Sequence, residues 1–188
     1  MAKGDLLLTD PRALRALAHP TRLAILERLH EVGSGTATAC GDAVGISPAA
    51  ASYHLRSLAK WGIVEETGGG TGRERPWRPV GTGFSFDSAA ATSPAELAAS
   101  AALSGQLVAN GERWTAEFVQ AEPGLAPEWR RASHLANKTL RLTPAEAEEV
   151  VARIEELLEP YGRSSRRDAP EDARATRLLL RVFPVDLP

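Results

Sequence analysis

The stretch that decides the fold is GDAVGISPAAASYHLRSLAKW, residues 41–61. It predicts two short helices joined by a tight turn at Gly45. Ser47 is a favoured residue for the N-cap of the second helix. Pro48 then occupies the first helical position, where the missing N–H has no cost. The second helix is therefore expected to begin at Pro48.

This second helix has two unlike faces. One is an apolar stripe with the i, i+4, i+7 spacing of a helix that packs on a core, formed by Ala51, Leu55 and Leu58. At 100° per residue the opposite face carries two cations, two hydroxyls and a methyl group, from Ala49, Tyr53, Arg56, Ser57 and Lys60. A solvated helix face usually mixes both charge signs, whereas this face has no carboxylate. We therefore interpret residues 47–61 as a DNA recognition helix.

Three further helices are expected before the recognition helix, over residues 12–18, 21–32 and 36–44. The first two are separated at His19, because a residue that precedes proline disfavours the α region. The third helix is the partner that positions the recognition helix.

A β-hairpin is predicted directly after the recognition helix. Two short strands, residues 62–67 and 73–80, flank a glycine-rich tip. A hairpin in this position is typical of a wing that contacts DNA phosphates or the minor groove. Arg73 and Arg75 are candidates for phosphate contacts, whereas Arg78 either joins them or pairs with a glutamate of the first strand.

The second half of the chain is predicted to be a separate region. Residues 81–92 are mostly small and are expected to link a domain of residues 1–92 to one of residues 93–188. The second region is expected to contain a long helix and then a strand-helix-strand unit whose strands pair antiparallel: residues 93–121, 135–142, 144–159 and 176–185. The expected fold class is α+β, mainly α.

Composition narrows the class of protein. The chain has 188 residues, a formal net charge of −2 and one cysteine. No apolar run approaches the ~20 residues that span a bilayer, and no signal peptide is evident, so we expect a cytoplasmic protein without a membrane partner. No catalytic constellation stands out from the background. We therefore expect neither an enzyme nor a cofactor.

Three segments resemble the ArsR-type winged helix-turn-helix regulators. They are LAHPTRLAILERL at residues 17–29, ISPAAASYHLRSLAKWGIVEE at residues 46–66 and the arginine-flanked wing. The resemblance implies a homodimeric repressor that binds double-stranded DNA and carries a C-terminal extension. It does not specify whether a small-molecule effector binds. The candidate DNA-binding residues are Thr36, Ser47, Ala49, Ser52, Tyr53, His54, Arg56, Ser57, Lys60, Arg73 and Arg75.

The same resemblance implies where the dimer forms and whether a metal binds. Dimers of this type use the first helix and a helix after the wing, so the candidate dimer residues are Leu14, Leu97, Ala101, Val108, Trp114 and Phe118. The metal sensors of the family carry paired cysteines or histidine and carboxylate clusters. Here Cys40 stands alone and residues 93–121 contain no histidine, so we expect no metal site.

The sequence allows more than one interpretation of the chain's function and of several residues. The chain could instead be a winged-helix protein-interaction scaffold. Its acidic second half would then bind the ligand or partner. Cys40 is either a small core residue or a redox sensor. Aromatic residues of the second half either pack in a core or line an effector pocket: Trp114, Phe118, Trp129 and Tyr161. His54 either packs against its neighbours or touches a phosphate.

Overall fold

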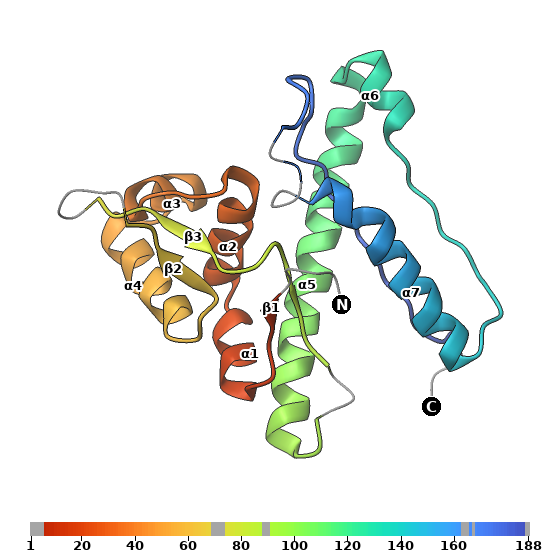
Figure 1. The fold of residues 1–188 in the computed structure, drawn as a ribbon, viewed down its shortest axis with the longest axis horizontal. Helices are drawn as coiled ribbons and strands as arrows, with labels where there is room; N and C mark the ends of the chain where they lie inside the picture. The colour runs from red at the N-terminus through yellow and green to blue at the C-terminus, as the bar shows by residue number, and fades with distance from the viewer. Residues whose placement is uncertain (1–5, 69–73, 88–90, 163–165, 167, 187–188) are drawn as a thin grey trace.

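The computed structural model describes residues 6–68, 74–87, 91–162, 166 and 168–186. Its elements in chain order are β1 (Leu6–Leu7), α1 (Pro11–Leu17), α2 (Pro20–Val32), α3 (Ala37–Val44), α4 (Pro48–Ala59), β2 (Val64–Glu66), β3 (Trp77–Pro79), β4 (Phe84–Ser85), α5 (Pro94–Ala121), η1 (Glu122–Gly124), α6 (Pro127–Ala132), α7 (Pro144–Leu158) and η2 (Glu159–Tyr161). Figure 1 shows α5 as a long helix, with α1 to α4 and the wing on one side of it and α7 on the other. The predicted class, mainly α with a winged helix-turn-helix, is confirmed.

One apolar core joins the helices of the first half. It contains Leu17 of α1, Leu23 and Leu26 of α2, and Leu55 and Leu58 of α4, each no more than 1% exposed. The predicted stripe of the recognition helix is therefore confirmed as its buried face. Burial of large aliphatic side chains is the main term that stabilises such a core, at about 1.5–3 kcal/mol for each.

The first part of α5 belongs to this same core. Ala99 and Leu103 are buried within it, and α5 packs along α1. A capping box at the start of the helix, in which Ser93 and Glu96 exchange hydrogen bonds, fixes where α5 begins. The division of the chain at residue 92 stays a prediction, but α5 packs against the region that precedes it.

Two small sheets complete the first half. The wing strands β2 and β3 pair antiparallel, with Glu65 opposite Arg78. The second sheet was not expected: β1 pairs parallel with β4. Residues 81–92 are thus not only a linker, because Phe84 packs on the core and the backbone of residues 83–85 bonds to Leu6 and Leu8.

The strand-helix-strand prediction for the second half is wrong in its strands. The helix α7 forms and begins at the capping box of Thr143 and Glu146, but residues 135–142 and 176–185 are assigned to no strand. A strand needs a hydrogen-bonded neighbour, and the two segments do not pair with each other. Leu140 and Leu142, whose alternation predicts a strand at residues 135–142, are exposed. Alternation over so few residues indicates an extended backbone but not a sheet.

Candidate nucleic-acid interface

The turn between α3 and α4 holds the predicted recognition helix in place. Gly45 has the left-handed conformation, with a φ of 73°, which ends α3 without the penalty that a side chain would carry. The N–H of Ile46 donates to the carbonyl of Gly41 at 2.9 Å. A Cβ on Gly41 would lie 2.8 Å from the Ile46 carbonyl oxygen, so only glycine allows this close approach. The angle between the two helices is therefore fixed by backbone contacts.

The outward face of α4 carries most of the predicted contact residues. Tyr53 is 62% exposed. Ala49, Arg56 and Lys60 are also exposed, and three neighbours at the edge of this face are half-buried: Ser52, His54 and Ser57. No carboxylate of the described residues forms an ion pair with Arg56 or Lys60. The two cations are thus available to a polyanion.

Two of the predicted contact residues serve as helix caps. The Thr36 hydroxyl accepts from the N–H of Ala39 at 3.1 Å, and the Ser47 hydroxyl accepts from the N–H of Ala50 at 3.2 Å. Each cap satisfies a backbone donor that the helix itself cannot satisfy. Both residues lie at helix N-termini, where the helix dipole favours an approaching phosphate.

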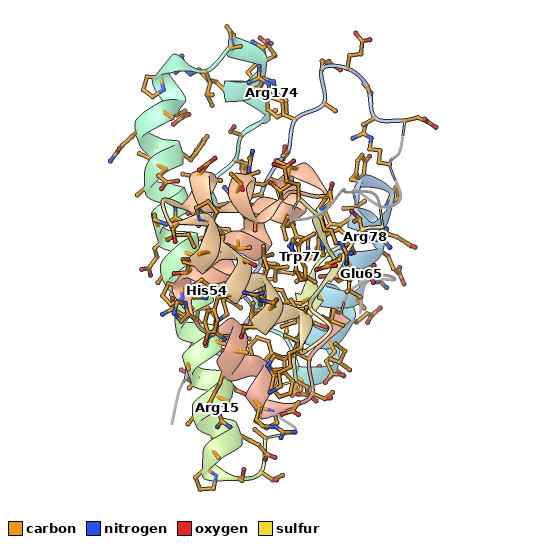
Figure 2. The ribbon with its side chains drawn as sticks, turned by 90° about the vertical axis from the view of Figure 1, so that its left-hand side faces the viewer. Arg15, His54, Glu65, Trp77, Arg78 and Arg174 are labelled. Atoms are coloured by element: carbon orange, nitrogen blue, oxygen red, sulfur yellow. The ribbon has the colours of Figure 1, made fainter. Side chains whose placement is uncertain are left out.

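The wing arginines are engaged by glutamates of the opposite strand. Arg78 pairs with Glu65 at 2.7 Å, and Figure 2 shows these two side chains next to each other. Arg75, a predicted phosphate contact, lies 3.2 Å from a carboxylate oxygen of Glu66. Both pairs are exposed, so each contributes little to stability and an approaching phosphate can compete for the arginine. Arg73 lies outside the described residues.

Two cations lie near the ring of Trp61, which follows α4. One of them, Arg12, is not among the residues predicted to contact DNA. The Arg12 guanidinium carbon lies 5.4 Å from the centroid of the Trp61 ring, and Lys60 Nζ lies 5.6 Å from it. Arg12 also binds Asp10, the N-cap residue of α1, and this lowers the pKa of the Asp10 carboxyl. No local pattern marks Arg12, because Trp61 follows it by 49 positions. Trp77 is buried, and Trp61 is half-buried against the core, so both indoles pack within the first half of the chain.

His54 packs against a second histidine rather than standing alone. Its ring centroid lies 4.9 Å from that of His19, whose Nδ1 accepts from the N–H of Thr21 and caps α2. His54 Nδ1 is buried without a hydrogen-bond partner among the described residues. Burial is the first cause that lowers the pKa of both rings, and the neighbouring charge of Arg22 lowers both further.

We expect the protein to lose stability as the pH falls through the histidine range. The unfolded chain takes up protons on these rings near pH ~6.5, while the folded rings stay neutral to lower pH. The unfolded state then binds more protons, so the melting temperature should fall between about pH 7.5 and about pH 5.5. Thermal melts of the wild type and of His54→Gln test this, because the variant should show the smaller fall.

Glu27 does not disturb that comparison. Burial raises the pKa of its carboxyl, so the folded state binds more protons there and the linked stability is lost as the pH rises. This effect has the opposite sign and is present in both proteins. An equal fall of the melting temperature in the two would show that His54 is not the group that titrates.

The residues predicted to form the dimer interface differ in their exposure to solvent. Leu14 is 5% exposed and lies in the core of its own chain, so its assignment to an interface is corrected. Leu97 and Val108 are 53% and 41% exposed on α5, and Ala101 between them is exposed too. Trp114 and Phe118 are half-buried.

Other chemistries have little support in the described residues. No group of three or more histidine, cysteine, aspartate or glutamate residues in this part of the chain could hold a metal ion. Cys40 is buried, and burial raises the pKa of its thiol, which favours a core residue over a reactive thiolate. None of the described helices has the length and apolar character needed to cross a membrane.

Comparison with known proteins supports the assignment of α3 and α4. Residues 17–67 match the family model of a helix-turn-helix domain, and this range runs from the end of α1 to the end of β2. A search of curated proteins gives no match. The matched domain and the exposed cationic face of α4 together indicate a DNA-binding transcription regulator.

Proposed function

We propose that the chain is a homodimeric repressor of the ArsR type. Each protomer would place α4 in a major groove of double-stranded DNA and rest its wing on the backbone or in the minor groove. The observation that carries this proposal is the outward face of α4, where Arg56 and Lys60 have no carboxylate partner among the described residues. Either cation can bind guanine O6 and N7 or a phosphate.

The exposed surface of α5 supports the homodimer. Leu97, Ala101 and Val108 follow one another at helical spacing, on a different face from the buried Ala99 and Leu103. Small and apolar side chains at this spacing allow a second helix to approach closely. Two copies of α5 related by a twofold axis would present two α4 helices to half-sites about one helical turn, ~34 Å, apart.

Any effector would act by changing how the two protomers of the dimer are arranged. A ligand that binds one arrangement of the dimer more tightly than another shifts the population, and so changes the separation of the two α4 helices. Such a ligand would bind in the C-terminal half of the chain, and we assign it no chemical class. We propose no enzymatic activity and no cofactor for the chain.

Selection from random duplexes followed by a salt titration tests the proposal. The enriched duplex should bind two protomers, as measured by native mass spectrometry. Its affinity should fall steeply with salt, with a slope of log K against log salt of about −0.9 for each phosphate contact. Failure to enrich any duplex, or an affinity that salt does not change, would contradict DNA binding. A complex with one protomer would contradict the dimer.

A further inference from the structure

The C-terminal segment of residues 174–181 lies along α5 and α6, and three arginines hold it there. The guanidinium carbon of Arg174 lies 5.3 Å from the ring centroid of Trp129 in α6. Arg177 lies 4.1 Å from the ring centroid of Trp114 in α5, and Nη2 of Arg181 donates to a carbonyl of α5, that of Val108, at 3.3 Å. As the residue number of the arginine increases from 174 to 181, the residue number of its partner decreases from 129 to 108. The segment, which we call the strap, therefore runs antiparallel to α5.

The strap touches the backbone of α5 at a glycine. Gly111 is buried, and a Cβ there would lie 2.4 Å from Nη2 of Arg181 and 3.4 Å from a methyl of Leu179. A side chain at this position would require the end of the Arg181 side chain to move. The absence of a side chain on Gly111 therefore leaves room for the side chains of Arg181 and Leu179 against the helix.

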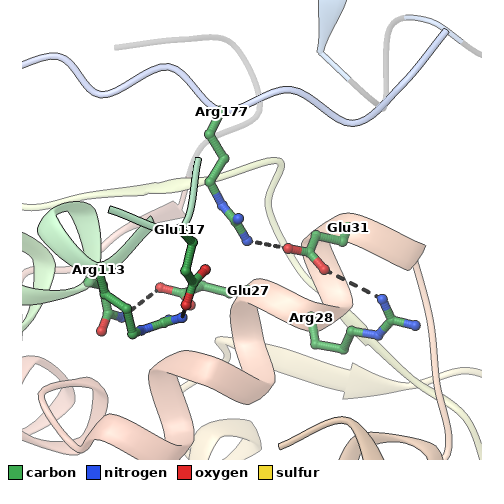
Figure 3. A network of polar contacts seen from close by, with 7 residues as sticks. Glu27, Arg28, Glu31, Arg113, Glu117 and Arg177 are labelled. Carbon is green, nitrogen blue, oxygen red and sulfur yellow. Dashed lines mark hydrogen bonds and ion pairs between the residues drawn. The ribbon is translucent and has the colours of Figure 1, made fainter. Parts of the chain in front are cut away.

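Among the described residues, Arg177 is the one strap arginine that contacts the helix-turn-helix domain. Arg177 forms an ion pair with Glu31 in the last turn of α2, and Glu31 also pairs with Arg28 at 3.5 Å (Figure 3). A second polar contact lies beside it, where the side-chain amide of Asn110 in α5 donates to Glu27 of α2 at 2.9 Å. These two contacts join α2 to the second half of α5 and to the strap.

The position of Glu31 makes this contact relevant to DNA binding. The helix α2 ends at Val32, and Gly35 just beyond it exchanges two backbone hydrogen bonds with Trp77 of the wing, at 2.9 and 2.8 Å. The first half of α5 is held on α1 by apolar packing, whereas its second half reaches α2 through polar contacts. A contact at Glu31 thus fixes α5 at a second point, close to the wing.

We propose that Arg177 is a positioning residue for DNA binding: from the strap it sets the angle between α5 and the helix-turn-helix domain. In the dimer proposed above, on which this inference rests, that angle determines the separation of the two α4 helices. Arg177 does not touch DNA. It restricts the domain to the orientation in which both recognition helices fit one duplex.

The test is a set of strap variants titrated with the selected duplex. Arg177→Ala should weaken binding about three- to tenfold, as expected for the loss of one exposed ion pair in each protomer. The slope of log K against log salt should stay unchanged, because no phosphate contact is lost. Arg174→Ala and Arg181→Ala are matched controls: they remove the same charge from the same strap and should leave the affinity unchanged. Exchange of the charges, Arg177→Glu with Glu31→Arg, should restore most of the affinity lost in Arg177→Glu alone.

Each other outcome has a definite meaning. Wild-type affinity in Arg177→Ala would overturn the inference while DNA binding stands. Equal losses in all three variants would also overturn it, since the strap would then act only through its packing on α5 and α6. A lower salt slope in Arg177→Ala would mean that this arginine contacts phosphate instead. A wild-type protein that binds no duplex would overturn the proposed function, and this inference with it.

Discussion

Replacing Arg56 and Lys60 together by alanine is expected to lower the affinity for the selected duplex about 100-fold or more. Each cation that contacts a base or a phosphate contributes about 1–3 kcal/mol, and the dimer would carry two copies of each. Both side chains are exposed and lack a carboxylate partner among the described residues, so their removal should not disturb the fold. A fluorescence anisotropy titration at two salt concentrations measures the loss and the accompanying change of salt slope.

A matched variant separates this effect from a general loss of positive charge. Lys138→Ala with Arg153→Ala also removes one lysine and one arginine from exposed positions, but from the region around α7. It should bind DNA like the wild type. If the two double variants bind alike, α4 does not read the duplex, and the winged-helix scaffold that binds another protein becomes the better interpretation. Retention of the dimer in both variants, by sedimentation, shows that assembly is unaffected.

Local sequence rules predicted the helices of the first half and the start of α5 well. Ser47 and Pro48 place the start of α4, and Ser93 and Pro94 place the start of α5, because a cap and a first-turn proline act within a few residues. The buried stripe of α4 followed from the helical period alone. Helix starts and buried faces are therefore the features that a single sequence specifies most directly.

Pairings between distant segments could not be predicted in the same way. The strands β1 and β4 contain two residues each, too few for an alternation to be recognised, and they pair across almost the whole first half. Conversely, the alternation of Leu140 and Leu142 predicts a strand, but no described segment pairs with residues 135–142. The existence of a strand depends on its partner, and a local pattern does not contain the partner.

In the candidate site too, features within one element could be predicted, whereas contacts between distant segments could not. The cations of α4 could be identified from a helical wheel, since they share one element. The contact of Arg177 with Glu31 joins positions 146 residues apart and leaves no local signal. Gly111 likewise lies against Arg181 and Leu179 of the strap, which are distant in the sequence. A glycine on a helix face does not show which distant segment packs on it.

The largest loss of stability is expected from Leu55→Ala, on the buried face of the same helix. Leu55 is fully buried in the core, and truncating a buried leucine costs about 2–5 kcal/mol, through lost transfer free energy and an unfilled cavity. Domains of this kind have a total stability of about 5–15 kcal/mol, so the variant should be strongly destabilised in urea unfolding. Tyr53→Ala, two positions earlier, is the matched control: its side chain is 62% exposed, so stability should change little while DNA affinity falls. If Tyr53→Ala destabilised the protein as much as Leu55→Ala, the assignment of an inner and an outer face to α4 would be wrong, and the proposed DNA contacts with it.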